Sequence, residues 1–337
     1  MLGMHLTQIC STAYESAMNI GSQANDRRRE TAGFIVAAGF VLLAAVRDVY
    51  LGGLFQRITP LLIAIAAFSL CTVLFLPVLL GSRRSLVALR RRPGDLLWVN
   101  ITTACAWLGF LYALKLIEPT IVQILYSGIG PLSVIWIERY FSTDGGVRLS
   151  RSERIAFLGL FAALMFSAVV VLAGLSGAPS DSVGDAALGV IFAAGGGIAI
   201  SVATMLCRRL NDTGVTPSAL LALRFPATAA SAFVVLALLP SGLPTGAAWL
   251  EAVLVIAALL IVLASFVNQV AISLASPLTV RVVLAVGPVL IFFLQVFEGR
   301  LAASPYSLIA ATLYAFAALA AATARQRAIR VYRHPTP

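Results

Sequence analysis

Few side chains in this sequence have the types and spacing that enzyme or metal chemistry requires. The two histidines, His5 and His334, lie near opposite ends of the chain, and the four cysteines show no pairing or metal-ligand spacing. We therefore expect no metal site, no histidine base and no cofactor. The sequence contains neither a phosphate-binding glycine loop nor a G-x-S-x-G motif, so it favours neither an ATP-driven pump nor a serine hydrolase.

Two arginines within long apolar runs, Arg224 and Arg281, are candidates for binding chemistry. An arginine at the centre of a membrane helix costs about 2.5–3.5 kcal/mol on insertion scales, so its side chain should face protein or water. Either guanidinium could attract an anionic group of a solute. The alternative, in which each side chain extends to the lipid head groups, stays open.

Polar and aromatic side chains in other apolar runs complete the set of cavity candidates. They could orient a solute through hydrogen bonds and ring faces, or they could bond only to neighbouring helices. The candidates are Trp107, Gln123, Tyr126, Asn268 and Gln269. Three consecutive glycines at 195–197 indicate close helix packing rather than ligand binding.

Two glycine-proline pairs, Gly130-Pro131 and Gly287-Pro288, lie inside apolar runs. Proline has no backbone N–H, so the carbonyl four residues earlier loses its partner and the helix should kink. One interpretation is a pair of hinges beside a binding cavity. The other is a static kink, which is common in membrane helices.

Carboxylates lie mainly at the ends of the apolar runs, where exposure to solvent is the expected state. These residues are Glu118, Glu138, Glu251 and Glu298. None lies clearly in the middle of a run. A proton carrier is therefore not evident, and Asp48 beside Arg47 is only a weak candidate.

The elements that carry these residues are apolar runs unsuited to a water-soluble protein. The chain is 60% hydrophobic and 11% charged, whereas soluble domains carry about 25% charged residues. A bilayer core needs about 20 helical residues, and the runs are continuous rather than alternating, as helices require. We predict an all-α integral membrane protein with ten transmembrane helices near residues 32–52, 59–80, 95–114, 119–137, 154–174, 187–207, 217–239, 249–271, 278–297 and 304–323.

Basic residues are distributed asymmetrically between these runs. With ten helices and a cytoplasmic N-terminus, 18 of the 24 Lys and Arg residues fall on the cytoplasmic side, as the positive-inside rule requires. The other side receives Arg47, Arg57, Lys115 and Arg300. This pattern predicts a multi-pass protein of the cell (inner) membrane with both termini in the cytoplasm. The net charge of +10 thus reflects membrane topology, and no nucleic-acid partner is expected.

An internal repeat divides the chain into two halves. An offset of 157 residues aligns Thr59-Pro60 with Thr216-Pro217 and Gly130-Pro131 with Gly287-Pro288. Five helices per half would insert the second half upside down, an arrangement that transporters use. We predict a polar cytoplasmic tail at 1–30, which an alternative start at Met18 would shorten. The two repeats follow at 31–174 and 186–324, with a basic cytoplasmic tail at 325–337.

Three stretches of the sequence resemble motifs of the drug/metabolite transporter superfamily, in particular its EamA-type members. They are TPSALLALRF (216–225), YALKLIEPTIVQILYSGIGPL (112–132) and LASPLTVRVVLAVGPVL (274–290). The resemblance covers roughly residues 32–324, except that Ala67 stands at the position that matches Arg224. It implies ten helices, a central cavity between the halves and the export of metabolites or amino-acid-like solutes.

The leading hypothesis is therefore a secondary transporter, not an enzyme, that exports a small molecule by alternating access. The alternatives are a membrane-embedded enzyme and a membrane protein that keeps this fold without transporting. The enzyme is disfavoured because no histidine lies in any predicted helix. The expected partners are the lipid bilayer and a small-molecule substrate. A homodimer, the identity of the substrate, the direction of transport and the coupling ion all stay open.

Overall fold

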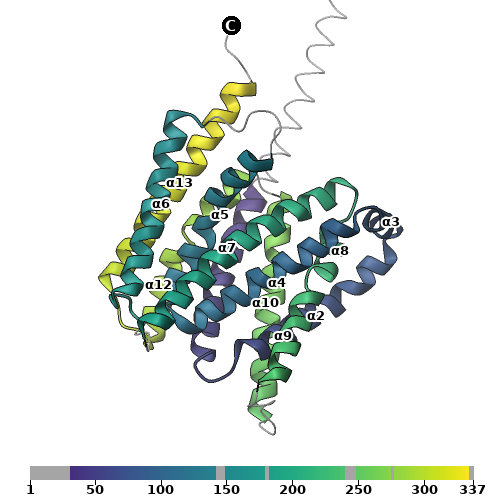
Figure 1. Ribbon diagram of the computed structural model, residues 1–337, viewed down its shortest axis with the longest axis horizontal. Helices are drawn as coiled ribbons and strands as arrows, with labels where there is room; N and C mark the ends of the chain where they lie inside the picture. Colours follow the sequence, from purple (N-terminus) through teal and green to yellow (C-terminus); the bar gives the residue numbers. More distant parts are fainter. Residues whose placement is uncertain (1–30, 142–148, 179–181, 240–247, 275–276, 334–337) are drawn as a thin grey trace, which may run out of the picture.

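The computed structural model describes residues 31–141, 149–178, 182–239, 248–274 and 277–333 (Figure 1). Within these ranges the secondary structure is helical, with no strand. Seven helical segments there are long and apolar enough to cross a membrane. The first is Thr31–Leu54, and another, Ser218–Leu238, contains the interruption described below. The prediction of an all-α, multi-pass membrane protein is confirmed. The expected tail at 1–30 lies outside the described residues, whereas residues 325–333 of the other expected tail continue the last helix.

Each predicted helix range overlaps one helix or two consecutive helices of the structure. After Thr31–Leu54 the helices are α2 (Pro60–Gly81), α3 (Arg83–Arg91), α4 (Pro93–Leu116), α5 (Pro119–Phe141), α6 (Arg151–Leu172), α7 (Val183–Asp212), α8 (Pro217–Leu223), α9 (Pro226–Leu238), α10 (Ala248–Leu274), α11 (Pro277–Ala285), α12 (Gly287–Glu298) and α13 (Pro305–Arg333). Proline opens seven of them, because the first helical N–H needs no partner within the helix.

The short, arginine-rich helix α3 was not predicted. Ser82 starts it by accepting a hydrogen bond from the Ser85 backbone N–H. Its length of 9 residues is far below the roughly 20 residues that span a bilayer. This helix therefore forms the connection between α2 and α4.

One predicted helix, 217–239, is interrupted, because α8 ends at Leu223 and α9 begins at Pro226. Pro226 donates no hydrogen bond and disfavours helical geometry in the residue before it. Asn100 of α4 binds both ends of the interruption. Its Nδ2 donates to the Leu223 carbonyl at 2.7 Å, and its Oδ1 accepts from the Ala227 N–H at 3.3 Å.

A second interruption separates α11 from α12 at Val286, just before Gly287-Pro288. The matching pair in the first half, Gly130-Pro131, lies inside the continuous helix α5. Likewise α2, which matches α8 and α9 at the repeat offset, is continuous. The two interruptions therefore occur in the second half of the sequence only.

Glycines allow α4, α5 and α7 to pack closely together. A Cβ atom on Gly109 of α4 would lie 2.9 Å from the Phe192 carbonyl oxygen of α7, and one on Gly197 would lie 2.4 Å from the Tyr126 carbonyl oxygen of α5. Such distances leave no room for a side chain. A Cβ on Gly195 would meet nothing within 4 Å. Two of the three consecutive glycines thus serve packing, since Gly196 also lies against Tyr126.

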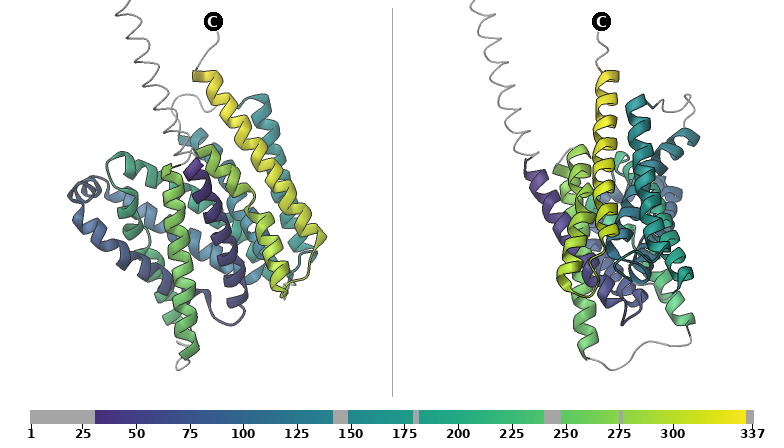
Figure 2. Two further views of the ribbon diagram at one scale, coloured as in Figure 1. Left: turned by 180° about the vertical axis from the view of Figure 1, so that it is seen from behind. Right: turned by 90° about the vertical axis from the view of Figure 1, so that its left-hand side faces the viewer.

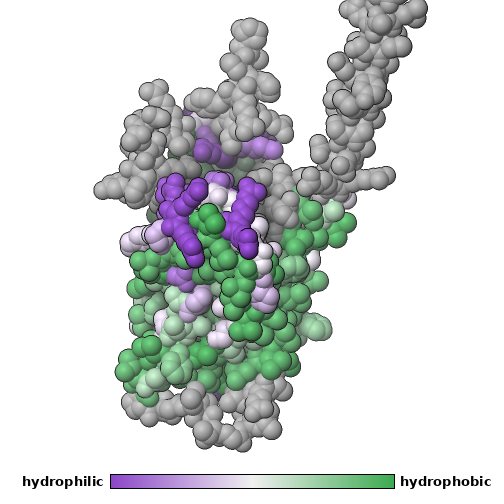
Figure 3. All heavy atoms as spheres, turned by 90° about the vertical axis from the view of Figure 1, so that its right-hand side faces the viewer, coloured by the Kyte–Doolittle hydropathy of each residue, from purple (hydrophilic) through white to green (hydrophobic). Residues whose placement is uncertain are grey.

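The outer surface of the helix assembly is apolar. α6 and α13 lie side by side at one edge, and α2, α3, α8 and α9 lie toward the other (Figures 1 and 2). Large hydrophobic side chains are exposed, among them Phe297 at 90%, Leu238 at 78% and Phe316 at 69%. Figure 3 shows a face that is mostly hydrophobic, with hydrophilic residues gathered toward its upper end. This surface suits contact with lipid.

Candidate functional site

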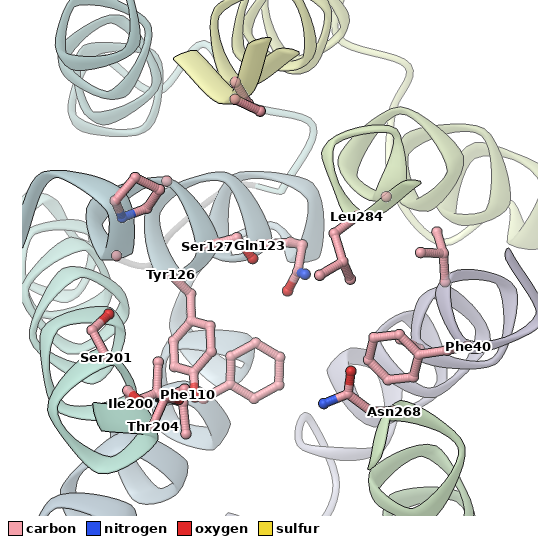
Figure 4. Close-up of a pocket in the computed structure, with 18 of the residues that line it drawn as sticks. Phe40, Phe110, Gln123, Tyr126, Ser127, Ile200, Ser201, Thr204, Asn268 and Leu284 are labelled. Atoms are coloured by element: carbon pink, nitrogen blue, oxygen red, sulfur yellow. Dashed lines mark hydrogen bonds between the residues drawn. The ribbon is translucent and has the colours of Figure 1, made fainter. Parts of the chain in front are cut away.

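A cavity of about 880 Å³ lies among the helices. Small-molecule sites typically measure about 300–1,000 Å³. Its walls come from the helix Thr31–Leu54 and from α4, α5, α6, α7, α8, α10, α11, α12 and α13. In Figure 4, Gln123 and Tyr126 of α5, Phe40 of the first helix and Asn268 of α10 face the same open space.

Most of the candidate residues from the sequence are brought together in this lining. The cavity is lined by Trp107, Gln123, Tyr126, Gly130, Pro131, Arg224, Asn268 and Gly287. Pro288 is buried beside it. The side chains of Gln269 and Arg281 lie outside the described part of the structure, which places only their helices, α10 and α11.

Arg224 lies in the interruption between α8 and α9, where it lines the cavity. Its Cζ is 5.0 Å from the ring centroid of Phe225. Its Nε is buried, and the guanidinium forms no hydrogen bond or ion pair with any residue that the structure describes. The interruption thus presents to the cavity a cation that has no partner among the described residues.

A second cation, Arg47, also lines the cavity and was missed as a site residue in the sequence analysis. The basic-residue pattern assigned it to the outer side of the membrane, but only 6% of its surface is exposed. Asp48 explains this burial, because its Oδ1 lies 2.7 Å from both Nε and Nη2 of Arg47. The Arg47 Cζ also lies 5.5 Å from the Trp107 ring and 5.6 Å from the Phe110 ring.

Aromatic rings connect the two arginines. Phe110 contacts Trp107 at a centroid distance of 5.9 Å, and Trp107 contacts Phe68 at 5.1 Å. Phe68 stacks on Phe225 at 5.0 Å, and Arg224 lies over Phe225. Aromatic faces attract cations and planar groups. Trp107, Phe110 and Phe225 line the cavity with the two arginines, and the buried Phe68 packs between Trp107 and Phe225 behind the wall.

One end of the cavity carries two further arginines, Arg208 of α7 and Arg325 of α13. Along α13 the lining runs from Tyr314 to Gln326, about 18 Å at 1.5 Å per residue. Arg325 donates a hydrogen bond of 3.2 Å to Glu153 of α6. Glu153 also accepts from the Ser150 N–H at 2.8 Å. This ion pair ties α6 to α13 beside the cavity.

Before the first lining residues of α5 and α13, Gln123 and Tyr314, lies a buried polar cluster around Glu118, which precedes α5. Its Oε2 accepts from the Gly177 N–H at 2.8 Å and from the Ser307 hydroxyl at 2.6 Å. Its Oε1 accepts from the Gln295 amide, whose oxygen accepts from Thr120 at 3.0 Å. The expectation that Glu118 is exposed to solvent was wrong: its exposed fraction is 0%, because α12 and α13 cover it.

The described residues contain no group of three or more His, Cys, Asp or Glu side chains that could hold a metal ion. The site is instead a polar and aromatic cavity inside an apolar helical assembly. The class that the fold and the site define is a multi-pass helical membrane protein with a central cavity.

Comparisons with known proteins give information on the fold only. No known protein family matches the chain, and no curated protein matches it. Among solved structures, a crystal structure described only as that of a protein matches with a TM-score of 0.57 and 20% sequence identity. The match covers 88% of this chain and 99% of the other chain. The helical arrangement thus occurs in a second protein of similar extent.

Proposed function

We propose that this protein is a secondary transporter that moves a small solute through the central cavity by alternating access. The observation that carries the proposal is that both interrupted helices, α8–α9 and α11–α12, border the cavity. Interrupted helices at a central site are typical of secondary transporters, where freed backbone groups and helix ends bind solutes and ions.

A two-fold relation between the halves supports the proposal. Phe68 and Phe225 are equivalent at the repeat offset of 157 residues, and their rings stack at 5.0 Å with an interplanar angle of 21°. Equivalent residues contact each other directly where a pseudo-two-fold axis passes between them. Thr59 and Thr216, also equivalent, both cap the helices that follow them. In this proposal ten spanning segments form two inverted halves, as the resemblance to EamA-type transporters implies.

In this proposal the cavity is open to one side of the membrane only. Arg208 and Arg325 line one end, and in this proposal the buried Glu118 cluster closes the other. The positive-inside rule assigns the arginine-rich end to the cytoplasm. The proposed conformation is therefore open to the cytoplasm, and both termini of the inner-membrane protein lie on that side. Export requires a second conformation in which the Glu118 end opens.

Counterflow in proteoliposomes tests the proposal. Liposomes containing the purified protein are loaded with an unlabelled pool of metabolites, and the uptake of labelled members of the pool is followed. We expect accumulation of at least one solute above that of protein-free liposomes. If no member of a broad pool accumulates while the protein is folded and correctly inserted, the transport proposal fails.

The proline hinges give a second test of alternating access. Pro131→Ala restores the N–H that the continuous helix α5 lacks, so it should stiffen α5 and slow counterflow several-fold. Pro77→Ala in α2 is the matched control, because Pro77 also lies inside a helix but does not line the cavity. Full transport by Pro131→Ala would remove the hinge from the proposal and leave the cavity in place.

A further inference from the structure

We infer that the central cavity binds small organic anions, with the acidic group held by Arg224, the charge of Arg47 adding to the attraction, and an apolar or aromatic body packed on the rings of the lining. The inference rests on the proposed function for the fate of the ligand, but the binding itself can be tested without transport.

The charge of the cavity wall is the first argument. The described lining residues include four arginines (Arg47, Arg208, Arg224 and Arg325) and no aspartate or glutamate. Two carboxylates lie directly behind this wall, Asp48 on Arg47 and Glu153 on Arg325. The other two, Arg208 and Arg224, have no carboxylate partner among the described residues. A cation would be repelled from such a wall, whereas an anion would be attracted.

Arg224 is the second argument, because a partly buried guanidinium needs hydrogen-bond acceptors. Desolvating a charged group without a partner is costly, yet its Nε is buried without an acceptor among the described residues. The side chain cannot be neutralised by losing its proton, since arginine stays charged in proteins. A carboxylate or phosphate accepts two parallel N–H bonds from one guanidinium, and it would satisfy this side chain.

Arg47 adds a second positive charge and a further donor to the same lining. Its Nε and Nη2 both donate to a single oxygen of Asp48, Oδ1. Its Nη1 forms no hydrogen bond with any residue in the described ranges, which leaves a donor for the ligand. Asp48 meanwhile holds the guanidinium in place over the rings of Trp107 and Phe110.

The neutral part of the lining indicates the body of the ligand. The lining that holds the two arginines also includes the rings of Trp107, Phe110 and Phe225, and aromatic rings pack well against flat or apolar groups. Trp107 Nε1 is a buried donor without a partner among the described residues. The amides of Gln123 and Asn268 face the open space (Figure 4). An organic acid with an aromatic or compact apolar body fits this combination better than a sugar or a polyamine.

Binding to the purified full-length protein in detergent tests the inference. The probes are indole-3-acetate, phenyl phosphate and the neutral indole-3-acetamide, titrated by calorimetry. We expect the two anions to bind and the amide, which matches indole-3-acetate in shape, to bind about 10-fold more weakly or not at all. Equal binding of the amide and the carboxylate would overturn the inference, and so would the absence of binding by both anions.

Substitutions locate the anion. Arg224→Gln should weaken indole-3-acetate binding about 10- to 100-fold, as expected for lost hydrogen bonds to a charged group. Arg224→Lys retains the charge without the planar fork and should give an intermediate loss. Arg92→Gln is the control, because the Arg92 side chain is 55% exposed and does not line the cavity. Unchanged binding in a folded Arg224→Gln protein would contradict the proposed site.

A lipid phosphate at Arg224 is the competing source of the same chemistry. Phosphatidylglycerol added to the detergent should not compete with indole-3-acetate if the site takes soluble acids. Full competition that is lost in Arg224→Gln would identify a lipid site and refute the soluble ligand. A protein that binds the carboxylate but supports no counterflow would refute transport alone. Counterflow of neutral solutes only, without carboxylate binding, would refute the anion site alone.

Discussion

The Glu118 cluster offers a prediction whose size follows from its hydrogen bonds. Glu118 accepts from the Gly177 N–H, the Ser307 hydroxyl and the Gln295 amide, and all of its surface is buried. Glu118→Ala leaves these three donors without that acceptor. Each buried donor without a partner costs about 1–3 kcal/mol, and the Ser307 hydroxyl can rotate, so the expected loss of unfolding free energy is about 3–6 kcal/mol.

The assay is the midpoint of thermal unfolding in detergent, followed by the fluorescence of a size-exclusion peak. Taking about 2 °C per kcal/mol for a protein of this size, Glu118→Ala should lower the midpoint by about 6–12 °C. Glu118→Gln keeps one acceptor oxygen, which can face Gly177 and Ser307. Its amide can donate to the oxygen of a rotated Gln295 side chain. We therefore expect a loss near 1 kcal/mol, or about 2 °C.

Glu298→Ala is the matched control for this series. The Glu298 side chain is 34% exposed and pairs with Arg300 at 3.5 Å, so its removal should change the free energy of unfolding by less than about 1 kcal/mol. The reasoning is refuted if Glu118→Ala unfolds at the same temperature as Glu298→Ala. It is also refuted if Glu118→Gln is as damaging as Glu118→Ala, because hydrogen bonding would then not explain the role of the residue.

Two further predictions concern helix packing and the interrupted helix. Gly197→Ala should abolish correct folding, because the new Cβ would lie 2.4 Å from the Tyr126 carbonyl oxygen. The readout is the loss of a monodisperse size-exclusion peak. Gly195→Ala is the control and should leave the peak unchanged, because its Cβ would meet nothing within 4 Å. Asn100→Ala should lower the midpoint of thermal unfolding by about 4–8 °C, because the Leu223 carbonyl and the Ala227 N–H each lose a partner worth roughly 1–2 kcal/mol. An unchanged midpoint would contradict this prediction and show that water replaces the amide.

Local patterns predicted the helical segments and several of their starts. The uncharged runs correspond to helices because a bilayer leaves the backbone few alternatives, and Thr59 and Thr216 cap helices as short polar residues before proline commonly do. Trp107, Gln123, Tyr126 and Asn268 were proposed from their types alone, and the structure brings them into one lining. The ten-span count and the inverted repeat stay predictions.

Other features depend on distant partners and could not be predicted locally. Asn100 was overlooked because its role depends on the interruption between α8 and α9. The Leu223 carbonyl that it binds lies 123 residues later in the sequence. The interruption itself had a signal, since Pro226 follows Arg224-Phe225 in the middle of an apolar run. Arg47 and Asp48 are adjacent in the sequence and could have been read as an internal ion pair.

The sequence by itself determined that the chain is helical and lies in lipid, because hydropathy and backbone hydrogen bonding act on each segment separately. Tertiary structure decided which polar groups lose contact with water. Glu118 is buried because Gln295 and Ser307, which follow it by 177 and 189 positions in the sequence, cover it. Arg224 meets aromatic rings at the cavity because Phe225, which it contacts, packs through Phe68 against Trp107. Burial and charge pairing are properties of the assembled helices, since each depends on what other segments place nearby.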